Sequence, residues 1–431
     1  MSLLRRTERR LSNNPEQVTI YNREINKLEK EGYAVKITSE DVNRTTGSWY
    51  IPHYMVFHNG KARVVFNCSF TYQEHNLNNN LLPGPTLGPP LLGVLLRFRE
   101  HAVTISGDIR AMFHKVRLFS SDQPFLRFLW RDMEQDRQPD VYEWRVLPFG
   151  TTCSPCCATY AVRRHFKDHM NGNEDVMESV LTAFYVDNYL QSLPCPKQAA
   201  SLIDKLRAIL AKGGFDIRQW ACNVPDVVAH LPSDARSEAC ELWLSADRTE
   251  PQESTLGLRW NCLSDVLGYK KRSVFATEVT MRTVYRILAS QYDPLGFIIP
   301  YTTRAKVIVQ ALWRTERQWD DPIQDDLLPL WEAWESELTD LQNVTFPRRY
   351  TPFNITTEDV ELHVFCDASE KAYGAVAYIR VVDSTGQTHV SFVLARSRVA
   401  PKCQLSIPRL ELCAALTLEV PAFFCLPRRP T

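Results

Sequence analysis

Hydrophobic and polar positions follow two different periods along the chain, which predicts a mixture of helices and strands. Between Asn14 and Glu31 apolar residues recur every three to four positions, the spacing of an amphipathic helix. Two strand-like runs follow at residues 48–57 and 62–70, on either side of an Asn-Gly dipeptide that is a strong hairpin signal. Further strands are predicted at 103–109, 125–130, 142–146 and 180–189, and further helices at 91–99, 154–169 and 199–212. This mixture predicts an α+β layer rather than regularly alternating strand–helix units.

The last third of the chain shows a second pattern of this kind. Residues 313–341 are rich in tryptophan and acids and are predicted to be helical, and residues 347–357 have the composition of a linker. Three consecutive strands are then predicted at 361–367, 373–381 and 389–395, followed by a helix at 410–418. We therefore expect a separate C-terminal unit that begins near Tyr350.

Composition sets limits on the kind of protein. A length of 431 residues suggests two to three folding units, and 44% hydrophobic with 23% charged residues excludes wholesale disorder. Lys plus Arg equals Asp plus Glu at 50 each, which excludes a polybasic protein but not a local basic groove. The 12 cysteines are spread through a long chain, as in reduced proteins, and no apolar stretch approaches the ~18 residues of a membrane helix. We expect no membrane partner and a cytoplasmic location, with the nucleus or virus-like particles as alternatives.

Two acids in apolar strands are the first candidates for chemistry. Asp108 ends the run at 103–109, and Asp187 lies in Phe184-Tyr-Val-Asp-Asn188. A carboxylate in such a run is costly unless it is paired or binds a cation. Two of them on adjacent strands could hold two divalent cations ~4 Å apart, an arrangement that supports phosphoryl transfer. The alternative is that each acid is solvated at a strand end or paired with a neighbour such as Arg110.

The surroundings of these acids follow a recognisable order. Lys61 and Arg63 lie upstream on the predicted hairpin, where cations could grip a triphosphate. Phe113 follows Asp108 by five residues. The other segments are Gly60-Lys-Ala-Arg-Val-Val-Phe66, Leu81-Leu-Pro-Gly-Pro85, Leu147-Pro-Phe-Gly150, Gly213-Gly-Phe-Asp-Ile-Arg-Gln-Trp220, Tyr292-Asp-Pro-Leu-Gly296 and Arg396-Ser-Arg-Val-Ala-Pro401. In this order they resemble the reverse transcriptase region of Pao/BEL long-terminal-repeat retrotransposon polyproteins, and the resemblance runs from about residue 14 to 420.

The resemblance implies a right-hand polymerase fold of fingers, palm and thumb, followed by the start of a ribonuclease H-like α/β unit. The implied divisions are an N-terminal helical leader (1–40), fingers and palm (41–235), a thumb or connection segment (236–350), an incomplete ribonuclease H-like domain (351–420) and an unrelated tail (421–431). The implied activity is RNA-directed DNA polymerase, which adds dNTPs to a primer 3′-hydroxyl on a template–primer duplex with Mg²⁺ or Mn²⁺. Such an enzyme would serve the DNA integration pathway of the element.

The resemblance also assigns roles to single residues. Asp108 and Asp187 would be the metal-binding catalytic acids. Phe113 would exclude a ribose 2′-hydroxyl, Arg63 with Lys61 would contact the triphosphate, and Phe149 and Gly150 would border the nucleotide. The alternative interpretations are a core aromatic for Phe113, a solvated hairpin face for the two cations and a plain turn for 149–150.

The chain departs from the family pattern at two positions. Asn188 stands where family members usually carry a second successive Asp, so that one negative charge beside the cations is lost. Asn67 likewise replaces an expected Asp on the hairpin. These departures leave a second hypothesis, an impaired or domesticated remnant that binds nucleic acid without extending a primer.

A second group of acids lies beyond Tyr350. Phe365-Cys-Asp-Ala-Ser369 and Leu410-Glu-Leu-Cys-Ala-Ala415 resemble parts of a ribonuclease H fold, with Asp367 and Glu411 as its first two metal ligands. The family needs further acids downstream, so ribonuclease H activity is not expected from a truncated domain.

Two minor features complete the sequence. The related polyproteins also encode a peptidase, and Asp383-Ser-Thr-Gly386 is superficially similar to an aspartic protease loop, but its extra residue favours a hairpin turn. A peptidase therefore stays a distant third hypothesis. Cys153, Cys156 and Cys157 are close together but lack a Cys/His pair at zinc-site spacing, so we expect them to be buried small apolar residues.

Overall fold

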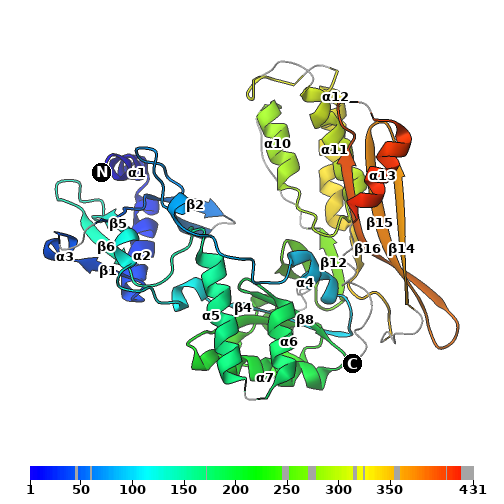
Figure 1. The fold of residues 1–431 in the computed structure, drawn as a ribbon, viewed down its shortest axis with the longest axis horizontal. Coiled ribbons are helices and arrows are strands. Elements are labelled where there is room, and N and C mark those ends of the chain that lie inside the picture. The colour runs from blue at the N-terminus through cyan, green and yellow to red at the C-terminus, as the bar shows by residue number, and fades with distance from the viewer. Residues whose placement is uncertain are drawn as a thin grey trace. The chain divides into compact units, whose positions relative to one another are not determined.

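A computed structural model describes the chain apart from residues 44–46, 59–60, 171, 245–251, 270–277, 314–317, 324–325, 354–359, 404 and 419–431. The chain divides into two compact units, each built from several segments (Figure 1). The first unit contains residues 1–88, 109–181 and 206–216, and the second contains residues 89–108, 182–205 and 217–431. None of the helices in the described part has the length and apolarity needed to span a bilayer.

The first unit combines helices with a small sheet and a hairpin. Its sheet has the order β1-β6-β5, all antiparallel, and β2 pairs with β3 in a separate hairpin. Its helices are α1 (Ser2–Ser12), α2 (Pro15–Lys30), α3 (Ser39–Asn43) and α5 (Ser154–His169). Its strands are β1 (Ala34–Ile37), β2 (His53–His58), β3 (Lys61–Phe66), β5 (Arg127–Trp130) and β6 (Asp140–Trp144).

The core of the first unit is aromatic. Phe66, Phe128 and Trp144 pack edge to face or tilted against one another with ring centroids 5.0–6.0 Å apart. The buried Tyr21 hydroxyl of α2 is hydrogen-bonded to His53 of β2, whose other ring nitrogen contacts the Leu129 carbonyl oxygen. Burial lowers the pKa of His53 to about 4, so this imidazole is neutral at physiological pH. The aromatic cluster therefore joins α2, the hairpin and the sheet through buried packing.

The second unit contains the sheet that carries both candidate acids. Its strand order is β7-β8-β4-β9, with β4 (Val103–Ile109) hydrogen-bonded to β8 (Asn188–Leu193) on one side and β9 (Ile217–Cys222) on the other. β7 (Phe184–Tyr185) forms a tight hairpin with β8. Gly107 lies where a Cβ atom would come within 3.2 Å of the Trp220 ring, which explains the glycine beside Asp108. Helix α4 (Leu91–Arg97) precedes β4, and α6 (Glu174–Ala183) and α7 (Pro196–Lys212) each have residues in both units.

A second antiparallel sheet and a group of helices follow in the same unit. The sheet has the order β10-β11-β12-β13. These strands are β10 (Gln252–Thr255), β11 (Leu258–Asn261), β12 (Val266–Tyr269) and β13 (Thr345–Pro347). The helices are α8 (Asp226–Ala229), α9 (Glu238–Leu244), α10 (Met281–Ser290), α11 (Ile299–Leu312) and α12 (Leu328–Ser336). The tryptophans of α12, Trp331 and Trp334, are buried in the core of this helical group, so they serve packing and are closed to stacking on bases.

The last part of the second unit is a three-stranded antiparallel sheet with one helix against it (Figure 1). Its elements are β14 (Val360–Ala368), β15 (Ala372–Val382), β16 (Thr388–Val399) and α13 (Ile407–Thr417). Asp383 and Gly386 lie in the turn between β15 and β16, where the Asp383 carboxylate accepts backbone N–H bonds from Thr385 and Gln387. The segment is therefore a hairpin turn, as the extra residue predicts.

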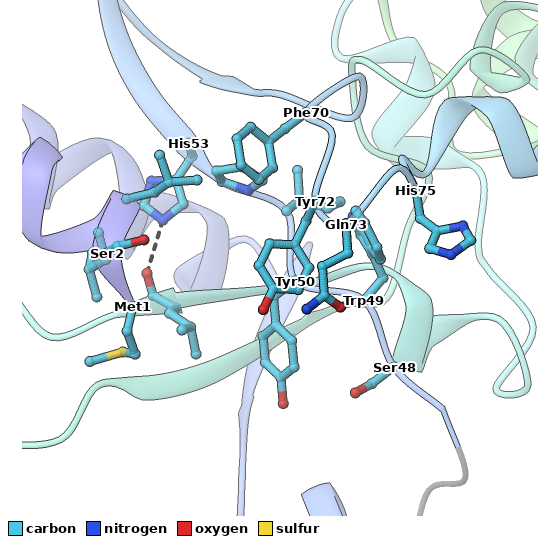
Figure 2. Close-up of a pocket in the computed structure, with 15 residues that line it drawn as sticks. Met1, Ser2, Ser48, Trp49, Tyr50, His53, Phe70, Tyr72, Gln73 and His75 are labelled. Atoms are coloured by element: carbon cyan, nitrogen blue, oxygen red, sulfur yellow. Dashed lines mark hydrogen bonds between the residues drawn. The ribbon is translucent and has the colours of Figure 1, made fainter.

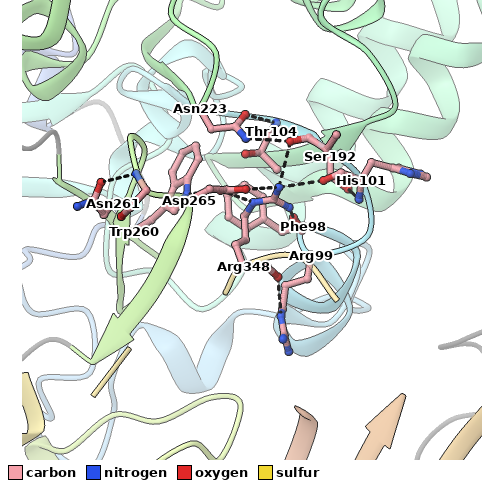
Figure 3. A network of polar contacts seen from close by, with 12 residues as sticks. Phe98, Arg99, His101, Thr104, Ser192, Asn223, Trp260, Asn261, Asp265 and Arg348 are labelled. Carbon is pink, nitrogen blue, oxygen red and sulfur yellow. Dashed lines mark hydrogen bonds and ion pairs between the residues drawn. The ribbon is translucent and has the colours of Figure 1, made fainter. Parts of the chain in front are cut away.

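A buried arginine fixes the start of β4 within the second unit (Figure 3). Arg348 is fully buried and forms a bidentate ion pair with Asp265, at 2.7 and 2.8 Å. The same guanidinium donates to the carbonyl oxygens of Phe98 and His101, in the segment between α4 and β4. The strand that carries Asp108 is thereby tied to β12 and β13, far away in the sequence.

One expectation from the sequence differs in part from this fold. The strand expected at 180–189 is confirmed for residues 184–185 and 188–189, which lie in β7 and β8. Its first four residues are wrong, because Val180 and Ala183 lie on the buried face of helix α6. A continuous apolar run is ambiguous between helix and strand, and here the helical spacing decides. The expected divisions at residues 235 and 350 stay predictions. Tyr350 lies in the core of the second unit, where its carbonyl oxygen accepts a hydrogen bond from Ser391 of β16.

Candidate active site

The two candidate acids converge on one end of the β7-β8-β4-β9 sheet. Asp108 is the cross-strand partner of Asn188 in the antiparallel β4–β8 pair, and Asp187 directly precedes Asn188 in the turn between β7 and β8. All three side chains are half-buried. The register of one strand pair therefore brings together residues that lie far apart in the sequence.

Electrostatics at this end of the sheet are unfavourable in the protein alone. Burial, and then the charge of Asp187, raise the pKa of Asp108 to about 6. Burial also raises the pKa of Asp187, against hydrogen bonds from its own backbone and from the Asn188 amide at 3.1 Å. Within the described part of the chain, no hydrogen bond or ion pair holds the Asp108 carboxylate. The charge of Asp187 therefore acts on the half-buried Asp108 carboxylate, which no cation of the described residues pairs.

The turn that carries Asp187 has an unusual backbone. Val186 has a φ of +58°, a left-handed conformation that β-branched residues rarely adopt. Tyr185 pairs with Asn188, so that Val186 and Asp187 form a two-residue turn, in which a positive φ at the first position matches the twist of the strands. Such a conformation costs of order 1–3 kcal/mol and is found most often at functional sites. The tight turn fixes the Asp187 carboxylate beside the end of β4.

The donor set at this site suits a hard divalent cation. The carboxylates of Asp108 and Asp187 and the side-chain amide oxygen of Asn188 are oxygen ligands of the type that Mg²⁺ and Mn²⁺ prefer. The described residues contain no group of three or more His, Cys, Asp or Glu side chains in ligating geometry. Mg²⁺ is commonly bound by one or two carboxylates together with water and substrate phosphates, so the site fits this ion.

The residues expected at the nucleotide gather in part around one loop of the first unit. The Phe113 ring contacts the Phe149 ring at a centroid distance of 4.7 Å, and His114 contacts the same ring at 4.9 Å. Phe113 is 7% exposed, whereas Phe149 is about half exposed. Gly150 has a φ of +101°, and a Cβ atom there would lie 2.6 Å from the Phe66 carbonyl oxygen, so only glycine fits. Phe113 therefore packs against the loop that contains Phe149 and Gly150.

The same loop is held by an asparagine that sequence reasoning missed. The Asn78 amide donates to the Gly150 carbonyl oxygen at 3.1 Å, and its own oxygen accepts the Thr152 N–H at 2.9 Å. A single Asn carries no sequence signal for such a role. Asn67, directly after β3, accepts the Ser69 N–H at 3.2 Å through its side-chain oxygen.

Of the two basic residues on the β2–β3 hairpin, only Arg63 has a side chain that the structure describes. Arg63 lies exposed on β3 opposite Val56. Lys61 begins β3, but its side chain and the turn at residues 59–60 lie outside the described residues.

The second group of acids does not form a comparable centre. Asp367 lies near the end of β14, is exposed, and accepts the Ala368 N–H at 2.8 Å. It lines a shallow hollow with residues of α11, β15 and β16, and Glu411 of α13 is not among the described residues that line it. Both carboxylates are exposed, whereas that of Asp108 is half-buried.

The three cysteines near the start of α5 differ from the expectation. Cys153 and Cys156 are partly exposed and Cys157 is exposed, so the expectation of buried apolar residues is wrong.

A cavity with aromatic lining in the first unit was not predicted. It has a volume of about 480 Å³ in the first unit, and Figure 2 shows Trp49, Tyr50, Phe70 and Tyr72 around it. The Trp49 indole nitrogen is buried and has no hydrogen-bond partner in the described structure. Met1 and the first three residues of helix α1 contribute to the lining. The side chains of Arg5, Arg6, Arg9 and Arg10 in α1 are exposed.

Comparison with known proteins decides the family. Residues 58–224 match the model of reverse transcriptase (RNA-dependent DNA polymerase), and residues 280–426 match the Pao retrotransposon-like RNaseH-like domain. The chain is a reverse transcriptase region followed by a Pao retrotransposon-like ribonuclease H-like domain. This confirms the resemblance inferred from the sequence motifs.

Known relatives support the same assignment. The reverse transcriptase chain is 28% identical over 182 residues to the Gag-Pro-Pol polyprotein of human T-cell leukemia virus 3, and this match covers 42% of the chain and 12% of the polyprotein. Two solved structures of the foamy viral protease-reverse transcriptase share its fold at 17% identity. The structure in complex with double-stranded DNA has a TM-score of 0.55, and the match covers 90% of this chain and 57% of that chain. The structure in complex with an RNA/DNA hybrid has a TM-score of 0.59, and the match covers 94% of this chain and 46% of that chain. The polymerase fold with a ribonuclease H-like unit is thus confirmed.

Proposed function

We propose that the chain is the RNA-directed DNA polymerase of a Pao/BEL-type retrotransposon, adding deoxynucleotides to a primer 3′-hydroxyl by a two-metal mechanism. The observation that carries the proposal is the convergence of Asp108 and Asp187 at one end of the sheet, where burial, and then the charge of Asp187, raise the pKa of Asp108 to about 6. Uncompensated carboxylates of this kind are typical of a site completed by a cation.

Each residue then has a defined part in the reaction. Asp108 and Asp187 would hold the divalent cations, and the side-chain amide oxygen of Asn188 would be an uncharged oxygen beside them. A cation bound there supplies positive charge that favours ionisation of the primer hydroxyl and neutralises the leaving pyrophosphate. Phe113 limits the space beside the nucleotide sugar. The two hydrogen bonds of the Asn78 side chain hold the loop of Phe149 and Gly150 in its conformation. Arg63 and Lys61 bind the triphosphate by charge.

The first unit also offers a surface suited to a nucleic-acid strand. Exposed aromatic rings such as Tyr72 provide stacking faces for unpaired bases, and the four exposed arginines of α1 provide charge for phosphates. We propose that the aromatic cavity receives the template strand of the template–primer duplex.

Primer extension tests this function directly. The full chain is given an oligo(dT) primer on poly(rA), labelled dTTP, and Mg²⁺ or Mn²⁺ in separate reactions. We expect extension by the wild-type chain and none by Asp108→Asn or Asp187→Asn. Equal, background-level products from all three proteins with both metals would overturn the polymerase proposal.

One observation favours a second function. Asn188 removes a negative charge from the metal site, so the chain would bind a template–primer duplex without extending it. A duplex-binding assay on the same proteins distinguishes this case, since binding would persist in the absence of extension.

A further inference from the structure

Two segments of the second unit that have no part in the proposed polymerase reaction are packed against each other. They are residues 292–296, which precede α11, and residues 396–401, which begin near the end of β16. The Arg396 guanidinium donates to the Pro294 carbonyl oxygen at 2.9 Å. Gly296 has a φ of +83°, and a Cβ atom there would overlap a backbone carbonyl oxygen of β16, so only glycine fits. These contacts hold β16 beside α11 (Figure 1).

A cavity of about 420 Å³ opens beside this junction. Its volume lies in the range of small-molecule sites, which is roughly 300–1,000 Å³. Helix α10 contributes Tyr285 and Leu288 to the lining, α11 contributes Thr302 and Lys306, and β16 contributes Arg396 and Ser397. The cavity therefore has a largely apolar wall on α10 and a polar wall on α11 and β16.

The polar wall carries more positive than negative charge. Lys306 and Arg396 are both half-buried, and Asp293 is the acid among the described residues that line the cavity. The Asp293 carboxylate accepts the backbone N–H groups of residues 296–298 at 2.7–2.9 Å, directly before α11 begins. Two cations therefore line the cavity beside one acid whose oxygens are already hydrogen-bonded.

Lys306 is the cation with the least compensation. In the part of the chain that the structure describes, no hydrogen bond or close ion pair holds its ammonium group. Burial lowers the pKa of Lys306, the charge of Asp293 raises it, and the charge of Arg396 lowers it again. A half-buried ammonium without a partner is costly, because it has lost water and gained no counter-charge. An anion in the cavity would supply that counter-charge.

The polar wall also offers hydrogen-bond donors of different kinds. The Ser397 and Thr303 hydroxyls are hydrogen-bonded to each other at 2.6 Å, a contact that uses one of their two O–H groups. The Arg396 guanidinium donates to the carbonyl oxygens of Ala395 and Pro294 through its two terminal nitrogens, and its Nε–H has no partner within the described chain. An ammonium, a hydroxyl and a guanidinium N–H suit the several oxygens of a phosphate, and two cations match its double negative charge.

We propose that this cavity binds a small organic phosphate, with Lys306 and Arg396 at the phosphate group and Tyr285 and Leu288 against the organic part. A nucleoside monophosphate combines a phosphate with a flat apolar face, so AMP is the probe. The inference does not depend on the proposed polymerase reaction, because the cavity is lined by other residues than the two aspartates of the candidate active site.

Calorimetric titration of the full chain with AMP in EDTA tests the proposal, since EDTA removes the divalent cations that the polymerase site would need. We expect saturable binding by the wild-type chain. Lys306→Met should weaken it by about 10- to 100-fold, the effect of one charge-assisted hydrogen bond, and adenosine should bind the wild type more weakly by a similar factor. Arg304→Met is the matched control: Arg304 lies in the same helix, is exposed and does not line the cavity, so the affinity should not change.

Lysine acetylation of the wild-type chain gives a second test that does not depend on how Lys306→Met folds. Acetylated sites are mapped by mass spectrometry with and without AMP, and we expect AMP to protect Lys306 and not the exposed Lys197. No saturable binding of AMP, equal binding by wild type and Lys306→Met, equal binding of AMP and adenosine, or an unprotected Lys306 would overturn the proposal. Protection of Lys306 by a DNA duplex and not by AMP would assign the cavity to a nucleic-acid backbone, and would overturn it as well.

Discussion

Asp108 and Asn188 are direct cross-strand partners, so an amide residue is paired with an aspartate whose pKa is raised by burial. The amide nitrogen is turned to the Asp187 carboxylate, to which it donates at 3.1 Å. One strand pair therefore contains two acids, one amide and no cation from the described residues.

Asn188→Asp should increase primer extension by about 10- to 100-fold, the usual effect of a group that supports a metal ligand. The change adds a negative charge where the cations bind and removes the hydrogen bond that partly compensates Asp187. The measurement is the initial rate of dTTP incorporation at a fixed Mg²⁺ concentration. Asn188→Ala serves as the control and should lower the rate; an unchanged rate in Asn188→Asp would show that this position lies outside the metal site.

Asp108→Asn should stabilise the protein at pH 7 when divalent cations are removed. The pKa of Asp108 is raised from 3.8 to about 6, so the folded state binds the proton more tightly than the unfolded chain. This contribution is favourable below pH 4 and is lost as the pH rises through 6. Removing the charge should increase the free energy of unfolding by about 1–2 kcal/mol at pH 7, allowing for partial solvent screening, and by little at pH 4.

Urea unfolding of wild type and variant in EDTA at both pH values measures this difference. The exposed Asp122→Asn is the control and should change neither value. A variant less stable than wild type at pH 7 would contradict the assigned electrostatics.

Arg348→Met should destabilise the second unit by about 3–5 kcal/mol, because it leaves the partly buried Asp265 without its partner and frees carbonyl oxygens at the start of β4. Arg282 and Asp320 form an equally bidentate pair at 2.6 and 3.0 Å, but their side chains are 59% and 74% exposed. Arg282→Met should therefore cost far less than Arg348→Met, because solvent screens an exposed ion pair. Chemical denaturation of both variants tests the contrast, and equal losses would contradict the anchoring role of Arg348.

Local patterns predicted much of the fold, whereas long-range partners could not be predicted. The helix at 154–169 has the predicted bounds because its apolar residues keep one face over four turns. The strand at 103–109 is likewise as predicted, since it is a short apolar run with clear ends. The pairing of Arg348 with Asp265 joins residues in different elements, and no local pattern in the sequence links the two.

The candidate site was predictable to a similar degree. The order of the motifs predicted that Asp108 and Asp187 act together. In the structure, the register of β4 and β8 brings the two residues to the same end of the sheet. Three features of the site depend on three-dimensional packing and have no recognisable residue spacing in the sequence. They are the positive φ at Val186, the hydrogen bonds of the Asn78 side chain to the loop, and the aromatic cavity.

Phe113→Val should relax the choice between deoxyribo- and ribonucleotides. Phe113 packs against Phe149 in the loop proposed to border the nucleotide, and a smaller side chain would leave room for a 2′-hydroxyl. We expect the ratio of UTP to dTTP incorporation to rise by about 10- to 200-fold, the range that one steric contact can supply. A purely structural role would lower incorporation of both nucleotides and leave the ratio unchanged.

Binding of Mn²⁺ to the full chain, followed by the loss of the free-ion electron paramagnetic resonance signal, tests the central claim most directly. The account predicts saturable binding by the wild-type chain that weakens at least tenfold in both Asp108→Asn and Asp187→Asn and is unchanged in Asp122→Asn. Equal binding by wild type and the two site variants would contradict the claim that these two aspartates share a cation.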